Sequence, residues 1–328
     1  MKRILSLVLV AVLAIGAIAL VGCNGAQNNK TVKLGLGVYV TTKATSATKD
    51  ADGQGQVTIT AAVVTVDENG KITGCKLDTS DNTVMYTNDG KAISGGEFKT
   101  KYEQGDAYKM VANGGAKLEW YKQADAFAGL VVGKTLSEVK ALVAEGNKGN
   151  SDVIAAGCTI KVNDFVLAIE KAYNNAKDSA ATAADALKLG VNTAQTVKDV
   201  NKDANGQNKL ETTFFASAVD KNGKIVAATV DVVEVTFTFD ANGASTYDAT
   251  KAVMSKREQG DNYNMVANGG AKLEWYKQAD VFAAQCVGKT AGDVEALMGS
   301  DNYGTADVKG AGCTILVNGF VKAAAKTK

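Results

Sequence analysis

The pattern of apolar and polar positions near the start of the chain predicts a β-hairpin. Residues 56–66 and 71–78 are rich in Val, Ile and Thr, which is typical of strands. The residues between them, Asp67-Glu68-Asn69-Gly70, end in Asn-Gly, and this pair supplies the positive φ that a tight hairpin turn needs. Residues 83–87 are predicted to form a third, short strand.

A different period appears in residues 116–132 and predicts a helix. Trp120, Ala124, Phe127 and Val131 recur at i, i+4, i+7 and i+11, so they lie on one face of an α-helix, and Gly133 is expected to end it. The stripe is wide enough to be the core-facing side of the helix.

Further elements complete a mixed α+β unit. Residues 135–138 read Thr-Leu-Ser-Glu, a capping box that predicts a helix ending near Gly146. Residues 158–162 are predicted to form a strand, and Asn163 is predicted to cap a helix that runs to Tyr173. Strands followed by helices in this order predict the α+β fold class.

The chain contains this unit twice. Residues 103–135 and 258–290 are identical at 27 of 33 positions, and the similarity continues on both sides. We therefore predict two tandem homologous domains, residues 32–177 and 187–328, joined by a linker at 178–186. The Ala-rich stretch 176–188, which contains neither Pro nor Gly, is predicted to be helical.

The N-terminus has the pattern of an export signal. Met1-Lys2-Arg3 precedes an apolar run, and Leu20-Val21-Gly22-Cys23 is a bacterial lipobox. We expect residues 1–22 to be a signal peptide, Cys23 to carry a lipid, and residues 23–31 to be a polar tether. A transmembrane anchor is the weaker interpretation, because the apolar run is shorter than a bilayer requires. The predicted location is the outer face of the cell membrane, with the membrane contacted through the lipid.

Composition removes several classes of chemistry. The chain has no His, which excludes His-based catalytic triads and His-ligated zinc, and we predict neither catalytic residues nor a metal site. Its 36 basic and 35 acidic residues give a net charge of +1, so we do not expect nucleic acid as a partner. Removal of Lys2 and Arg3 with the signal would leave 34 basic residues against 35 acidic ones.

Among the five cysteines, only Cys158 and Cys313 occupy equivalent positions in the two copies. A disulfide framework would repeat with the domain, so the two residues are interpreted as local site or core residues. Each is followed by Thr, in the repeated sequence Ala-Gly-Cys-Thr-Ile.

This segment resembles the Ser-Gly-Ala-Thr segment of FMN-binding domains, with Ala and Cys in place of the family's Ser and Ala. The Gly-Asp-x-Tyr and Glu-Trp-Tyr segments are also similar to those of flavinylated lipoproteins of Gram-positive extracellular electron transfer. The resemblance implies that a flavin transferase esterifies the FMN phosphate to Thr159 and to Thr314. It also implies a membrane quinone or dehydrogenase as the electron donor and an extracellular acceptor.

The residues themselves are also compatible with a phosphate site here, although from the spacing alone an ordinary junction of strand and helix is the better explanation, and only the resemblance in both copies reverses that order. Gly157 and Gly312 would let a bulky nucleotide approach the backbone, and Asn163 and Asn318 would cap helices whose N–H groups attract an anion. Apolar side chains upstream could pack against the flavin ring, although the core is the first role expected for the two Trp residues. These candidate contacts are Trp120, Trp275, Met110 and Met265.

Two functions therefore remain open from the sequence. The first is a lipid-anchored electron carrier with two covalent FMN groups, an electron-transfer flavoprotein rather than an enzyme with its own substrate. The second is an unmodified tandem-repeat lipoprotein with a binding or structural role. A flavin-using reductase is a weaker third interpretation, because the sequence indicates no substrate pocket.

Overall fold

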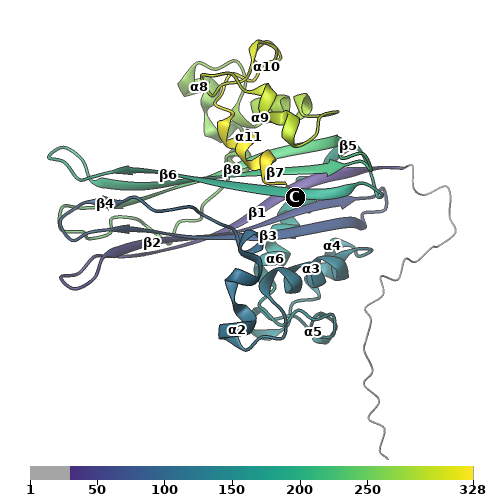
Figure 1. Ribbon diagram of the computed structural model, residues 1–328, viewed down its shortest axis with the longest axis horizontal. Helices are drawn as coiled ribbons and strands as arrows, with labels where there is room; N and C mark the ends of the chain where they lie inside the picture. Colours follow the sequence, from purple (N-terminus) through teal and green to yellow (C-terminus); the bar gives the residue numbers. More distant parts are fainter. Residues whose placement is uncertain (1–29, 328) are drawn as a thin grey trace, which may run out of the picture.

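The computed structural model describes residues 30–327, so the predicted signal peptide and Cys23, the predicted site of lipidation, lie outside the described residues. Two antiparallel sheets form the middle of the molecule, and helices cover the outer face of each (Figure 1). The layers follow the order helix, sheet, sheet, helix. The predicted α+β class is confirmed.

The first sheet has the strand order β4-β3-β2-β1-β5. Its strands are β1 Thr31–Thr45, β2 Gly53–Val66, β3 Ile72–Tyr86, β4 Ala92–Ile93 and β5 Lys177–Thr182. The predicted hairpin joins β2 and β3: the Asp67 carboxylate accepts hydrogen bonds from the N–H groups of Asn69 and Lys71, and Gly70 has a φ of 73°. The two strands predicted at 71–78 and 83–87 are parts of the single strand β3.

Six α-helices accompany the first sheet: α1 Lys101–Gln104, α2 Met110–Gly114, α3 Trp120–Val131, α4 Leu136–Lys140, α5 Ser151–Ala155 and α6 Asn163–Asn174. The apolar stripe of α3 is buried as predicted. Helix α3 begins four residues later than predicted, because the Glu119 carboxylate accepts hydrogen bonds from the N–H groups of Met110 and Val111. Helix α4 ends before the predicted Gly146, whose φ of 70° does not fit a helix.

Over the described residues, the second half of the chain repeats most of these elements, without counterparts of β4 and β5 and with a 3-10 helix, Gly292–Leu297, in the place of α4. Its sheet has the order β6-β7-β8, with β6 Ala186–Lys198, β7 Gly206–Val219 and β8 Ile225–Phe239. Its α-helices are α7 Lys256–Gln259, α8 Met265–Gly269, α9 Trp275–Gln285, α10 Ala306–Gly310 and α11 Asn318–Ala325. Within residues 30–327, no helix is long and apolar enough to cross a membrane.

The prediction of a helix at residues 176–188 is wrong. Lys177–Thr182 form the edge strand β5, which pairs antiparallel with the start of β1, and β6 begins at Ala186. Helix propensity is a weak preference, and here the open edge of β1 and the burial of Ala181 decide the conformation.

The two sheets share one hydrophobic core. Leu36 and Val38 of β1 belong to the same buried cluster as Phe214 and Phe237 of the second sheet. Strand β1 packs against β8 and β3 packs against β6. Because β6 is the repeat of β1 and β8 is the repeat of β3, the halves are related by an approximate two-fold axis.

Two equivalent aromatic residues, one from each half, stack on each other at the contact between the sheets. Tyr86 ends β3, and Phe239 occupies the same position at the end of β8. Their rings stack in parallel, with centroids 4.3 Å apart. Each half therefore presents the same surface to the other, as in a symmetric dimer.

Candidate functional site

Thr159 and Thr314 occupy matching exposed loops at the outer helical layers, and each is held by one glutamine. The N–H and the hydroxyl of Thr159 both donate to Oε1 of Gln123, at 2.8 and 3.0 Å. Thr314 makes the same two bonds to Gln278 at the same distances. Each threonine is thus an exposed residue whose hydroxyl is held in one defined orientation, toward its glutamine.

The glutamines are themselves fixed in the core. Gln123 is 1% exposed, and its Nε2 donates to the Leu118 carbonyl at 2.9 Å and lies 3.3 Å from the sulfur of Met110. Gln278 repeats both contacts. Sequence reasoning missed these residues, although both lie in the nearly identical repeated segment. Met110 and Met265 therefore support the glutamines, which support the threonines.

The glycine two residues before each threonine determines the backbone of the loop. Gly157 has a φ of 100° and Gly312 a φ of 115°, in the left-handed region that side chains other than hydrogen disfavour. A Cβ on Gly157 would lie 3.2 Å from Leu118, which leaves little space for one. The glycines serve the conformation of the loop that presents Thr159 and Thr314.

Cys158 and Cys313 are core residues. Both are fully buried in the apolar clusters of their halves, and burial raises the pKa of the Cys158 thiol to about 11. Burial also raises the pKa of the Cys313 thiol. Within residues 30–327 every cysteine is a free thiol. A buried, protonated thiol is a poor nucleophile, so we assign no reactivity to the two cysteines.

Two local predictions around Thr159 are wrong. Residues 158–162 do not form a strand, and their pairing is limited to one bridge between Lys161 and Lys148. Asn163 is the first residue of α6 rather than its cap, because Val162 occupies the cap position without a side-chain bond. Asn318 of α11 likewise follows a cap position taken by Val317. Neither asparagine therefore prepares an anion site by capping.

The predicted core role of the tryptophans is confirmed. Trp120 and Trp275 are each 4% exposed and meet Phe165 and Phe320 edge to face, with centroids 5.7 and 5.9 Å apart. Trp120 also lines a pocket of about 220 Å³ together with Met110, and Ile160, next to Thr159, contributes to the same wall. The pocket is therefore adjacent to the threonine loop.

A lysine lies over the aromatic side chains of each site. The Lys101 ammonium is 5.9 Å from the ring centroid of Trp120 and 5.4 Å from that of Tyr108. In the second half, Lys256 lies 5.8 Å from Trp275 and 5.6 Å from Tyr263. These distances fall within the range of cation–π attraction. The threonine, glutamine, methionine, tryptophan and lysine thus form the same arrangement twice.

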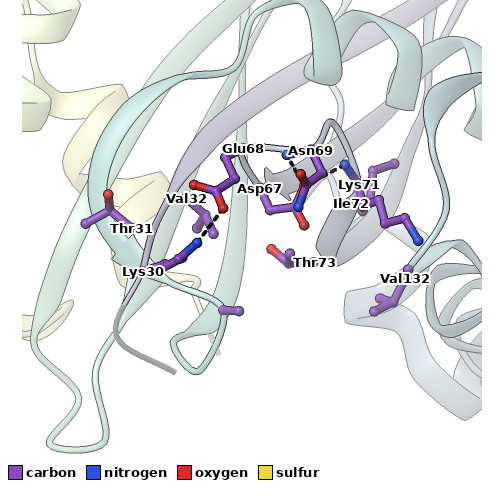
Figure 2. A pocket seen from close by; sticks show the side chains of 12 residues that line it. Lys30, Thr31, Val32, Asp67, Glu68, Asn69, Lys71, Ile72, Thr73 and Val132 are labelled. Carbon is purple, nitrogen blue, oxygen red and sulfur yellow. Dashed lines mark hydrogen bonds and ion pairs between the residues drawn. The ribbon is translucent and has the colours of Figure 1, made fainter. Parts of the chain in front are cut away.

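Another pocket, of about 340 Å³, lies at the start of β1, and neither Thr159 nor Thr314 lines it (Figure 2). Lys30 and Glu68 form an ion pair there, beside the β2–β3 turn. Because this ion pair is exposed and such pairs contribute little, we assign no chemistry to the pocket.

A buried carboxyl lies beneath α1. Asp78 of β3 accepts hydrogen bonds from the N–H groups of Thr79 and Tyr102, and its counterpart Asp231 accepts them from Val232 and Arg257. Burial raises the pKa of the Asp78 carboxyl to about 7, and burial also raises the pKa of Asp231. The carboxyl binds its proton more tightly in the folded chain than in the unfolded one.

This carboxyl leads to a pH-dependent prediction for Asp78→Asn. Asp78 titrates near 3.8 when unfolded and near 7 when folded, so its contribution to stability is full below pH 4 and lost as the pH rises to 7. The uncharged amide of the variant would carry no such dependence. We expect the free energy of unfolding of the wild type, relative to the variant, to fall by up to about 1.4 kcal/mol per pH unit in this window. Urea titrations of the wild type and the variant at pH 4.5 and 7 measure this difference in the free energy of unfolding.

The exposed Asp152→Asn is the matched control and should leave the pH profile of the wild type unchanged. Parallel profiles for wild type and Asp78→Asn would contradict the prediction.

Comparison of the chain with protein-family models, with curated proteins and with solved structures gives no match in any of the three. In residues 30–327 no cluster of three or more acidic or cysteine side chains could hold a metal ion. The geometry around the two threonines is therefore the main structural guide to function.

Proposed function

We propose that the protein is a lipid-anchored extracytoplasmic electron carrier built from two tandem FMN-binding-type domains, with FMN joined covalently to Thr159 and Thr314. The observation that carries the proposal is an exposed threonine, repeated in both halves, whose hydroxyl donates to a buried glutamine.

The residues around Thr159 fit an attached flavin. Thr159 is an exposed residue that a flavin transferase would reach, and the pocket beside the loop offers Trp120, Tyr108 and Met110 as walls for a flat aromatic ring. Lys161 and Lys101 line the same pocket together with one carboxylate, Asp164, and the remaining positive charge suits a phosphate. When attached, FMN supplies one- and two-electron chemistry.

The absence of histidine agrees with this function, since the chain would only position the cofactor and set its surroundings. Covalent attachment also suits a protein outside the cell, where free FMN is dilute and a reversible site would stay largely empty. The lipid on Cys23 would keep the carrier at the outer face of the membrane. A membrane quinone or dehydrogenase would reduce it, and an extracellular acceptor would oxidise it.

The proposal is tested by producing the full chain with and without a flavin transferase. After denaturation, flavin fluorescence in a gel and the intact mass report covalent attachment. We expect fluorescence and two FMN-sized mass additions only with the transferase. A chain without flavin in both samples would contradict the carrier function and favour an unmodified binding or structural lipoprotein.

A further inference from the structure

Two ion pairs cross between the halves in a reciprocal way. Lys326 at the end of α11 pairs with Glu103 of α1 at 3.0 Å, and Lys171 in the last turn of α6 pairs with Glu258 of α7 at 2.5 Å. Lys326 stands 155 residues after Lys171, and Glu258 the same number after Glu103. The pairs are thus the same contact made twice across the approximate two-fold axis.

Each glutamate also holds the start of a short helix. The second carboxylate oxygen of Glu103 accepts a hydrogen bond from the Thr100 N–H at 2.9 Å, while the Thr100 hydroxyl accepts one from Glu103 N–H at 3.1 Å. Glu258 and Ser255 form the same capping box at the same distances. One oxygen of each glutamate therefore orients its own helix, and the other binds a lysine of the opposite half.

These short helices carry the lysines of the candidate sites. Lys101 is the first residue of α1 and lies over Trp120, and Lys256 is the first residue of α7 and lies over Trp275. A shift of the helix start would move the ammonium relative to the aromatic wall of the pocket. The geometry of each site therefore depends on its glutamate.

We propose that each half positions the candidate flavin site of the other half, Lys326 acting on the Thr159 site and Lys171 on the Thr314 site. The helices support this arrangement, because α6 starts four residues after Thr159 and α11 starts four residues after Thr314. Helix α6 thus begins next to the Thr159 site and its last turn contacts α7 of the Thr314 site. Helix α11 begins next to the Thr314 site, and Lys326 at its end contacts α1 of the Thr159 site. The ion pairs follow from the structure, whereas calling these regions flavin sites rests on the proposed function.

The ion pairs act on position more than on folding. Their side chains are between 17% and 33% exposed, and pairs of this kind contribute at most about 1 kcal/mol to stability. Removal of either lysine should therefore leave the chain folded with little change in its unfolding midpoint. The effect is expected at the opposite site.

The two tryptophans of the chain, one at each site, report this effect separately. In a 15N-labelled sample of the unmodified protein each indole N–H gives its own NMR signal, which Trp120→Phe assigns. We expect Lys326→Met to shift the Trp120 signal and leave that of Trp275 in place. Lys171→Met should shift the Trp275 signal alone, and the Arg variants at both positions should retain the wild-type spectrum.

Matched controls separate positioning from loss of charge. Lys322→Met removes an exposed lysine from α11, the helix that Lys326 directly follows, and Lys140→Met breaks a 2.5 Å ion pair with Glu170 inside the first half. Neither control should move either indole signal by more than its linewidth. Both would move signals if charge or general stability were responsible.

A crossed pattern supports the proposal. Shifts confined to the half that carries the substitution, equal shifts of both signals, or no shift would overturn it. Because the spectra are taken without flavin, failure of FMN attachment would contradict the proposed function and leave this result standing. Two FMN additions together with uncrossed shifts would support the proposed function and overturn the crossed positioning.

Discussion

Replacing Thr159 by Ala is expected to remove one of two FMN groups completely, and Thr314→Ala the other. The hydroxyl is the acceptor atom of the proposed phosphoester, and alanine keeps the loop but lacks that oxygen. The neighbouring thiol of Cys158 is buried and protonated, so it offers no substitute. Intact mass after production with a flavin transferase should fall by one FMN in each single variant and by two in the double variant.

Thr159→Ser is the matched control, because it retains a hydroxyl that can donate to Gln123. It should keep both mass additions, and peptide mapping should place one on residue 159. Persistence of two additions in Thr159→Ala would show that the site lies elsewhere.

Phe237→Ala is expected to lower the free energy of unfolding by about 3–5 kcal/mol, the range for a buried aromatic side chain replaced by alanine. Phe237 is fully buried in the core between the sheets, and its ring lies directly on the backbone of β2: a Cβ on Gly55 would be 2.3 Å from it. The cavity left by the substitution would therefore be lined by residues of both halves. Denaturant titrations followed by fluorescence measure the loss.

The same titration tests whether the halves unfold together. Trp120 and Trp275 lie in different halves, so variants that keep only one of them report each half separately. We expect coincident transitions, both displaced by Phe237→Ala, because neither sheet can expose its inner face alone. Val287→Ala, at a side chain that is 48% exposed, should change stability by no more than about 0.5 kcal/mol. Displacement of the Trp275 transition alone would contradict the shared core.

The parts of the fold that the sequence predicts are those that depend on neighbouring residues. The Asn69-Gly70 turn and the apolar stripe of α3 are local patterns, and both are confirmed. The stretch at 176–188 depends instead on β1, more than 140 residues earlier, which β5 joins. An alanine-rich segment shows only its helix propensity in sequence, so the strand could not be predicted from it.

In the candidate site, too, the sequence predicts the local features and misses the contacts between distant residues. The position of Thr159 after Gly157 follows from a short motif, whereas Gln123 lies 36 residues earlier and reaches the loop only through the packing of α3. No periodicity distinguishes a buried glutamine that binds a threonine from an exposed one. The predicted capping by Asn163 was wrong because α6 begins one residue earlier than a cap would require, with Val162 at the boundary.

The two-fold contact between the sheets is made within one polypeptide, and this changes its thermodynamics. Two separate copies would assemble only above a concentration set by their dissociation constant. Here the connection through β5 and β6 makes the encounter intramolecular, with an effective concentration in the range of about millimolar for short linkers. The pairing of the two threonine sites is therefore insensitive to dilution, and a single molecule carries both.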